Sequence, residues 1–313
     1  VAELDVATSE NSIQESIAQI YIQILYAAES VRVNENTLQV SIAQRDRGQE
    51  LLNAGSIAKS DFAQLEAQVS TDRYQLVTAQ ATLQDYKLQL KQLLELDGEN
   101  EMNIYLPALS DENVLSPLPA KRDVYVSALA LRPEIEASKL NVNASELGID
   151  IAKSGYLPTV SLSAGIGTNH TSGSDFTFGE QVKNGWNNSI GLSVSVPIFN
   201  NRQTKSAVQK AKLQYETSML SLLDEQKALY KTIEGLWLDA NSAQQRYAAA
   251  NEKLKSTQIS YNLISEQFNL GMKNTVELLT EKNNLLQAQQ EQLQAKYMAI
   301  LNTQLLKLYQ GDK

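Results

Sequence analysis

One stretch of the sequence reads Val160-Ser161-Leu162-Ser163-Ala164-Gly165-Ile166, with an apolar residue at every second position. A second stretch with the same period follows, and its apolar members are Ile190, Leu192, Val194, Val196 and Ile198. Successive side chains of a strand point to opposite faces, so both stretches predict β-strands. We expect the apolar residues of both strands, including Val160, Leu162, Ala164 and Ile166, to share one face, opposite a face of small and polar residues.

The apolar face of this predicted hairpin needs a cover. The sequence offers no second sheet, but each run has roughly the 9 to 11 residues that a tilted strand needs to cross a bilayer. Tyr156, Trp186 and Phe199 lie at the ends of the runs, as in an interfacial aromatic belt, and the Gly-, Ser-, Thr- and Asn-rich residues 169–185 predict an external loop. We therefore predict strands whose apolar face meets membrane lipid. The alternative is a solitary amphipathic hairpin packed on a helix.

Long helices are predicted before and after the strands, because apolar residues recur there every seven positions. The four seams are Ile17, Ile24, Val31 and Leu38; Val69, Leu76, Leu83 and Leu90; Val208, Tyr215, Leu222, Leu229 and Leu236; and Leu279, Leu286, Leu293 and Ile300. Such narrow seams are typical of coiled coils. From residue 203 to 308 we expect two helices of about fifty residues, each about 75 Å long.

The two helical parts resemble each other when residue n is placed against residue n + 216. Ile17 then falls on Ile233, and Gly55 falls on Gly271. Each glycine lies between two heptad stretches, which predicts the turn of a helical hairpin. A chance alignment of heptad sequences is the alternative explanation.

The repeat also predicts what precedes the first hairpin. A shorter helix, with Pro133 in its first turn, and the strand pair lead into the second hairpin, so their counterparts should begin at 133 − 216 = −83. We therefore expect an N-terminally shortened form that lacks on the order of eighty or more residues, including a first strand pair. Because lipid tolerates no open sheet edge, the strands present must join a barrel made by several chains.

Composition argues against several classes of function. The 313-residue chain has a net charge of 27 − 36 = −9, no cysteine and one histidine, His170. We therefore expect no metal site, no cofactor, no nucleic-acid partner and no enzyme activity. The sequence contains no run of about 18 apolar residues and no signal peptide after Val1, so we expect that any export signal has been removed. No Gly-rich phosphate loop is visible, so energy for any transport must come from a partner.

These patterns predict a mainly α fold with long antiparallel coiled-coil hairpins and a short transmembrane β-hairpin that joins a β-barrel made by several chains; the resemblance described below implies that the hairpins form one protomer of an α-barrel and that the β-barrel is trimeric. The predicted segments are a first helical hairpin at 1–97, a Pro-rich, loop-rich connection at 98–132, a shorter helix at 133–155, the β-hairpin at 156–200 and a second helical hairpin at 201–313.

Four segments carry a resemblance to a known family: Leu131-Arg132-Pro133-Glu134-Ile135; Gly155 to Gly165; Leu192 to Asn200; and Phe268-Asn269-Leu270-Gly271 followed by Thr275-Val276-Glu277-Leu278-Leu279. In this order, over almost the whole chain, the sequence resembles the TolC-like outer-membrane factor family, the outer membrane efflux proteins. These proteins are the exit ducts of Gram-negative efflux pumps, including those of multidrug resistance, and of type I secretion systems.

The resemblance implies a homotrimer in which each complete chain gives two strand pairs to a shared barrel and two helical hairpins to a periplasmic tunnel. It also implies a periplasmic adaptor protein and an inner-membrane pump as partners, and lipid of the outer membrane around the strands. Since one strand pair is expected to be missing, we expect impaired or absent conduction by this chain.

The resemblance further implies a closed entrance at the hairpin tips. Asp61 matches an aspartate after the first tip glycine, and Lys273 matches a basic residue after the second, which implies an ion pair between neighbouring hairpins. Glu277 matches one acid of a constriction ring, whereas Thr280 replaces a second acid, so the ring would lose one charge per protomer. Glu281 is adjacent, but a helix rotates it by about 100° from Thr280. Solvated charges on a coiled-coil surface are the alternative.

Adaptor contacts are implied at the same tips, by Gly55, Ser56, Ile57, Gly271, Met272 and Asn274. The alternative function is a periplasmic coiled-coil adaptor or tethering protein, although adaptors normally combine one hairpin with compact β-rich domains. Arg132 and Pro133 are predicted only to set the start of a helix, and His170 is predicted to be a surface residue without a role.

Overall fold

The computed structural model describes residues 1–96, 104–105, 114–173 and 175–311. Two compact units make up the chain. One unit, called the hairpin unit because it contains the β-hairpin, comprises residues 137–225 together with Val1. The other, the coiled-coil unit, comprises residues 2–136 and 226–313 and contains the helical hairpins. None of the helices among the described residues combines the length and the apolar content that crossing a membrane requires.

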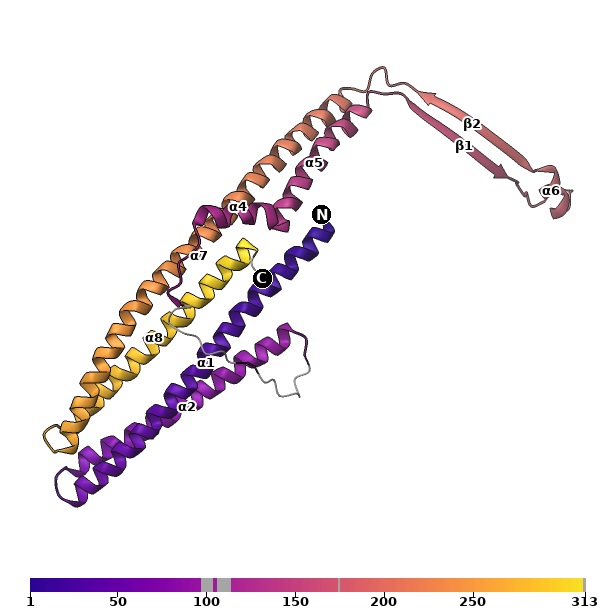
Figure 1. Cartoon of the computed structure of the whole chain (residues 1–313). Coiled ribbons are helices and arrows are strands. Elements are labelled where there is room, and N and C mark those ends of the chain that lie inside the picture. Colours follow the sequence, from indigo (N-terminus) through magenta and orange to yellow (C-terminus); the bar gives the residue numbers. More distant parts are fainter. Residues whose placement is uncertain (97–103, 106–113, 174, 312–313) are drawn as a thin grey trace. The chain divides into compact units, whose positions relative to one another are not determined.

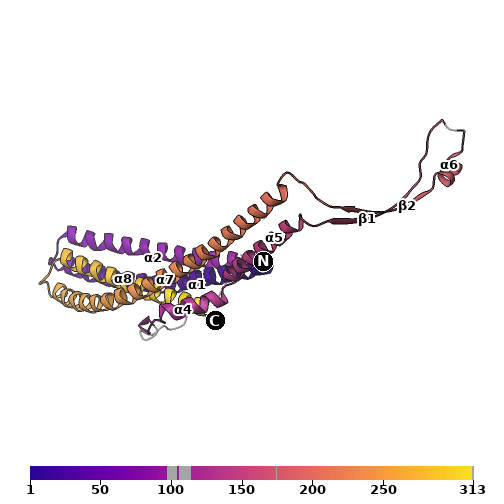
Figure 2. The ribbon, with the colours of Figure 1, turned by 90° about the horizontal axis from the view of Figure 1, so that it is seen from above.

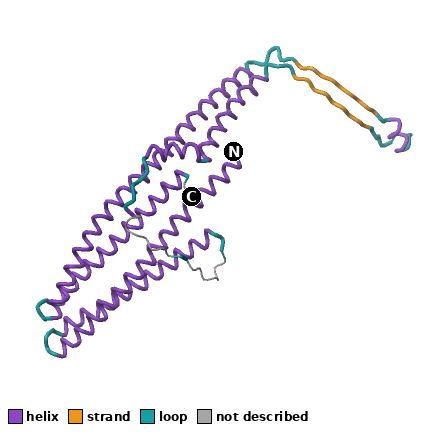
Figure 3. The backbone as a smooth tube through the Cα atoms, in the orientation of Figure 1, coloured by secondary structure: helices purple, strands orange, loops and turns teal. Residues whose placement is uncertain are grey.

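Two helical hairpins build the coiled-coil unit. Helices α1 (Ala2–Asn53) and α2 (Lys59–Leu93) form the first, and the later part of α7 (Gln203–Asn269) forms the second with α8 (Thr275–Gln310). In each hairpin the helices run side by side and are joined by a short turn (Figures 1, 2 and 3). The predicted long helices are confirmed, but α7 and α8 have 67 and 36 residues rather than about fifty each, because the predicted turn at Gly271 does not divide residues 203–308 equally.

The predicted seams lie where the helices pack, since every seam residue is buried or half-buried. An apolar cluster in the middle of the unit consists of Ile22 and Leu25 of α1, Val114, Ala243 and Tyr247 of α7, and Leu293, Ala295, Tyr297, Ala299 and Ile300 of α8. A second cluster, the tip cluster, takes one buried residue from each of the four helices: Leu51, Leu65, Phe268 and Leu278. Apolar packing therefore joins the two hairpins to each other as well as the helices within each hairpin.

Helix α4 (Lys121–Leu131) lies inside the predicted loop-rich connection and was not predicted. Its eleven residues are too few to show a seven-residue period, and its buried residues are only Val124 and Ala128, one turn apart. Residues 97–103 and 106–113 of the same connection lie outside the described residues. Helix α5 (Pro133–Ser154) follows and confirms the predicted shorter helix, with proline at the first position, where its missing N–H costs no hydrogen bond.

In the hairpin unit, strands β1 (Thr159–Gly167) and β2 (Asn187–Ser195) form a two-stranded antiparallel sheet. Their register pairs apolar residues with apolar residues: Val160 with Val194, Leu162 with Leu192, and Ala164 with Ile190. The intervening pairs, such as Ser161 with Ser193, therefore lie on the other face. The predicted strands are confirmed, but Val196 and Ile198, which were predicted to belong to the second strand, lie outside it, because β2 ends at Ser195.

The predicted external loop contains a helix that the sequence analysis missed, α6 (Phe178–Asn184). A capping box starts it, in which the carboxylate of Glu180 accepts a hydrogen bond from the backbone N–H of Thr177 at 2.9 Å. His170 contacts this helix through Gln181, with 3.1 Å between Nδ1 and Oε1, and through the ring of Phe178, with 5.3 Å between centroids. His170 is exposed as predicted, but it has a structural contact with α6.

Candidate functional site

The turns at the tips of the two helical hairpins have the same backbone structure. The φ angle is +72° at Gly55 and +74° at Gly271, the left-handed region that glycine adopts without strain. The N–H of Gly55 donates to the carbonyl of Leu52, and the N–H of Gly271 donates to that of Phe268, both at 2.9 Å. In each turn the next amide bonds one residue further back, which completes a Schellman motif. The correspondence at n + 216 is therefore confirmed at the tips.

Helix α8 begins with a capping box next to an ion pair. The side chain of Asn274 accepts from the N–H of Glu277 at 2.9 Å, and Glu277 Oε2 accepts from the N–H of Asn274 at 3.2 Å. Lys273 Nζ lies 2.5 Å from Glu277 Oε1. The lysine ammonium, and then the amide of Asn274, hold the pKa of the Glu277 carboxyl below its usual value. The second tip thus holds an ionised carboxylate in a defined position.

Asp61 has the same place in the first hairpin as Glu277 has in the second. It is the third residue of α2, and its Oδ2 accepts from the N–H of Ala58 at 3.4 Å. Within the chain, Asp61 thus caps its own helix, and Lys273 pairs with Glu277. The ion pair between Asp61 and Lys273 of neighbouring hairpins stays a prediction.

Thr280, which stands where the resemblance implies an acid of the constriction ring, and its neighbour Glu281 both have hydrogen-bond partners within the chain. The hydroxyl of Thr280 donates to the carbonyl of Val276 on its own helix at 2.7 Å. Glu281 accepts from the hydroxyl of Ser260 on α7 at 3.1 Å. Glu281 is therefore engaged at the contact between α7 and α8, which does not favour it as a replacement for the acid missing at Thr280.

The predicted adaptor-contact residues divide into two groups. Gly55, Ser56, Gly271, Met272 and Asn274 are exposed, whereas Ile57 is half-buried against the tip cluster. Their contact with an adaptor stays a prediction.

Arg47 makes a contact between the tips that the sequence analysis missed. Its Nη2 donates to the carbonyl of Asn269, the last residue of α7, at 3.2 Å, while its Nη1 pairs with Glu50 at 2.6 Å. A cation is favoured at a helix C-terminus because of the helix dipole. This contact crosses from α1 to α7, so it adds a polar link between the hairpins next to the tip cluster.

The apolar face of the β-hairpin is uncovered in the single chain. Within the strands, the exposed fractions of its large side chains range from 61% for Val194 to 84% for Ile190. Val196 and Ile198, which follow β2 in the chain, are 59% and 95% exposed. The aromatic residues at the ends of the runs, Tyr156, Trp186 and Phe199, are also exposed. Contact of this face with lipid stays a prediction.

Arg132 does more than set the start of a helix, which corrects the prediction made from the sequence. Its side chain is 8% exposed, its Nη2 lies 2.6 Å from Glu15 Oε1, and its guanidinium lies 3.6 Å from the ring centroid of Tyr309. Glu134 Oε1 is 3.9 Å from Nη1. Burial, and then the Glu15 carboxylate, raise the pKa of Tyr309 to about 12. Arg132 therefore ties α1 and α8 to the junction of α4 and α5.

Among the described residues, no group of three or more His, Asp or Glu side chains is arranged to hold a metal ion. The polar features described above are helix caps, ion pairs between helices and charged tips. Such an arrangement can position helices and present charge.

The model of the outer membrane efflux protein family matches residues 124–311, more than half of the chain. The chain belongs to this family. The resemblance noted in the sequence is therefore confirmed.

Relatives with a curated name are similar over nearly the whole chain. Identity is 25% over 308 residues with the outer membrane protein TolC of Escherichia coli, which covers 94% of this chain and 60% of that protein. It is 24% over 294 residues with the outer membrane efflux protein BepC of Brucella suis, covering 93% and 61%. It is 21% over 309 residues with the alkaline protease secretion protein AprF of Pseudomonas aeruginosa, covering 97% and 63%. The chain thus spans about three fifths of the length of these relatives, which are outer membrane efflux and secretion proteins.

Solved structures with the same fold include channel proteins. The outer-membrane channel OprN matches with a TM-score of 0.82 at 19% identity, over 100% of this chain and 68% of that one. CusC matches with a TM-score of 0.83 at 19% identity, over 99% and 71%. The predicted fold class is therefore confirmed, and the relatives are channel proteins rather than enzymes.

Proposed function

We propose that the chain is a protomer of a passive export duct in the outer membrane of a Gram-negative bacterium, with most of its length in the periplasm. The observation that carries this proposal is the uncovered apolar face of the β-hairpin. Leu162 and Leu192 pair across the strands and remain 76% and 71% exposed. Removing such surface from water is favourable by about 25 cal/mol per Å². Lipid would cover this face, and strands of neighbouring chains would satisfy the sheet edges.

The helical hairpins suit the wall of a water-filled tunnel. Their apolar contacts form narrow seams, and Ser, Thr, Gln and charged side chains occupy much of the remaining surface. In a homotrimer, three copies of both hairpins would surround one lumen, and cargo would pass through it without any chemical step. An inner-membrane pump would supply the energy, coupled to the duct through a periplasmic adaptor.

The tips are the proposed entrance of the duct. Asp61 and Lys273 would pair between neighbouring chains and hold the entrance closed, with Glu277 lining it. An ion pair at such a partly exposed site is worth about 0–1 kcal/mol, which is weak enough for an adaptor to break. The exposed tip residues Ser56 and Met272 would lie in the adaptor contact.

The cargo class would be set by the pump and the adaptor. Relatives named for alkaline protease secretion and for pyoverdine export match this chain to a similar extent, at 21% and 22% identity. The same type of duct therefore serves both a protein and a small molecule among its relatives. A periplasmic adaptor or tethering protein is a weaker proposal, because the related solved structures are channels.

The first test is the mass of the purified chain by light scattering, in detergent with the bound detergent subtracted and in detergent-free buffer. One chain has a mass of 34.6 kDa, so a trimer has 3 × 34.6 = 103.8 kDa. A trimer that forms only in detergent would support the proposal. A monomer in both solutions would contradict assembly of a membrane duct by this chain.

The second test addresses the entrance and uses the absence of cysteine from the sequence. Two single variants, Asp61→Cys and Lys273→Cys, are mixed in detergent and oxidised. A covalent heterodimer on a non-reducing gel is expected if the two positions meet between chains. The matched control replaces Asp61→Cys by Asp85→Cys, 24 residues further along α2. Equal yields for the two mixtures would contradict the entrance assignment.

A further inference from the structure

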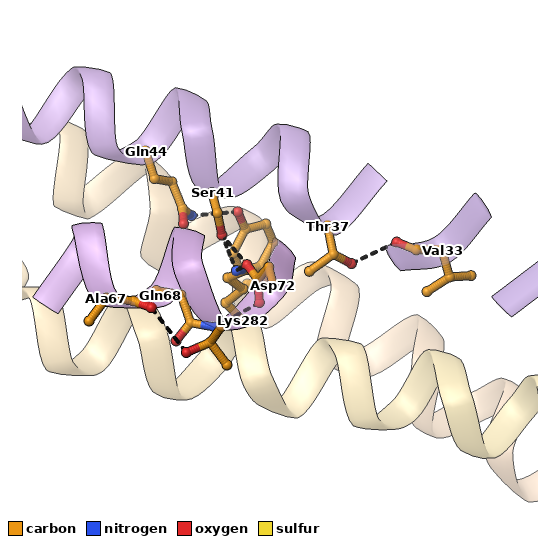
Figure 4. A network of polar contacts seen from close by, with 10 residues as sticks. Val33, Thr37, Ser41, Gln44, Ala67, Gln68, Asp72 and Lys282 are labelled. Atoms are coloured by element: carbon orange, nitrogen blue, oxygen red, sulfur yellow. Dashed lines mark hydrogen bonds and ion pairs between the residues drawn. The ribbon is translucent and has the colours of Figure 1, made fainter. Parts of the chain in front are cut away.

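The two helical hairpins are also joined by a buried ion pair that the proposed entrance does not use. Lys282 of α8 faces Asp72 of α2, and their side chains are only 4% and 1% exposed. Ser41 of α1, 2% exposed, accepts from the lysine ammonium and donates to the aspartate (Figure 4). Gln68 donates to the second carboxylate oxygen of Asp72 at 2.8 Å. Three helices from both hairpins therefore meet at one charged layer.

The charged layer occupies positions where a coiled coil normally places apolar residues. Each member follows a seam residue by three positions, as d follows a in a heptad. Ser41 follows Leu38, Asp72 follows Val69, and Lys282 follows Leu279. The seven-residue pattern therefore continues through the layer, but with a hydroxyl, a carboxylate and an ammonium.

Stability alone does not explain why charges stand there. Taking both charges out of water is costly, and a well-packed apolar pair of similar volume is often at least as stable. Burial lowers the pKa of Lys282, while Asp72 opposes that shift, as expected for a charge that needs its partner. Single polar residues at core positions of coiled coils are known to specify register.

We propose that Ser41, Asp72 and Lys282 set the register of the two hairpins relative to each other and thereby position the tips. Helices α2 and α8 both start at a tip, so they run in the same direction. A slip of one heptad would place Lys282 beside Leu65 or Ala79 instead of Asp72 and leave two buried charges unpaired. The tip cluster cannot enforce this register by itself, because apolar contact is not directional. Lys282 lies seven residues beyond Thr275, the first residue of α8, which is about 10 Å along the helix, so a slip there moves the tip.

The test measures the distance between the hairpins directly. Spin labels are attached to Ser70→Cys on α2 and Asn283→Cys on α8, both exposed positions, in a chain that has no other cysteine. The parent should give a single narrow distance by pulsed electron resonance. The apolar double variant Asp72→Leu with Lys282→Met should melt at a temperature no lower than the parent, yet show a second population displaced by up to about 10 Å, one heptad.

Two further variants complete the test. The reversed pair Asp72→Lys with Lys282→Asp should return most of the population to the parental distance, because the ion pair is re-formed. The control Lys253→Met with Glu291→Leu removes an exposed ion pair of 2.7 Å between α7 and α8, and should leave the distance unchanged. A folded apolar double variant with the parental distance, as narrow as in the parent, would overturn the proposal. The proposal depends on packing within the coiled-coil unit, so its failure would leave the duct function untouched.

Discussion

Replacing Arg132 by methionine should destabilise the coiled-coil unit strongly. Methionine keeps much of the aliphatic stem but removes the guanidinium, which pairs with Glu15 at 2.6 Å and covers the ring of Tyr309. The substitution leaves Glu15 and Glu134 without this cation, in a site where their side chains are only 25% and 26% exposed.

The size of the effect follows from burial. Breaking a buried ion pair by removing one partner costs about 3–5 kcal/mol. Because a quarter of each carboxylate side chain still reaches water, we expect the lower end of that range, about 3 kcal/mol, including the lost cation–π contact. A loss of this size should lower the melting temperature by about 6–10 °C.

Lys121→Met is the matched control, because Lys121 makes the same two kinds of contact at the other end of α4. It pairs with Glu234 at 3.2 Å and lies over the ring of Trp237 at 4.6 Å, but its side chain is 34% exposed. We expect a loss of about 1 kcal/mol or less. Thermal melting followed by circular dichroism compares the two variants, and a double-mutant cycle of Arg132→Met with Glu15→Gln isolates the ion pair. If Arg132→Met and Lys121→Met lower the free energy of unfolding by the same amount, burial does not set the size of the effect.

Three further predictions concern the tips and the strands. Gly271→Ala should lower the free energy of unfolding by about 1–2 kcal/mol, because the φ angle of Gly271 is +74°. Gly235→Ala is the control: no atom lies within 4 Å of the added methyl, so it should stabilise α7 by about 0.5–1 kcal/mol. Melting temperatures of the two variants that move in the same direction would contradict this prediction. Because the pKa of Glu277 is lower in the folded chain than in the unfolded chain, its carboxylate stabilises the fold fully above the pKa of the unfolded chain. This stabilisation is lost as the pH falls through the folded-state pKa, which lies below 4.5. Hydrogen exchange in the first turn of α8 should therefore speed up on acidification, beyond the intrinsic pH effect, and Glu277→Gln should abolish that extra change. Leu192→Arg should weaken flotation with lipid vesicles by about 2–4 kcal/mol, and Ser193→Arg on the opposite face should weaken it much less; equal effects would argue against lipid contact.

Local periodicity explains which elements were predictable. A seven-residue seam such as Leu279, Leu286 and Leu293 repeats often enough to identify a long helix, and alternation identifies the strand from Thr159 to Gly167. Helices α4 and α6 have 11 and 7 residues, so neither repeats its pattern. They were missed because two or three turns of helix are too short to show a seven-residue period.

Contacts between distant residues explain what was missed at the sites. The heptads mark the positions of Asp72 and Lys282, but the two residues are 210 positions apart, and their pairing depends on how one hairpin packs on the other. Arg132 likewise meets Glu15 across 117 positions. A charge in the sequence does not reveal whether water or a buried partner surrounds it.

The type of the long elements, the two glycine turns and the single apolar face of the strands could all be predicted without the structure, because each depends on residues that are close to one another along the chain. The burial of Arg132, and of the layer formed by Ser41, Asp72 and Lys282, depends instead on how distant helices pack against one another. Burial changes the energy of a charge far more than the identity of its neighbours in the chain does, since it removes the water that would otherwise solvate that charge.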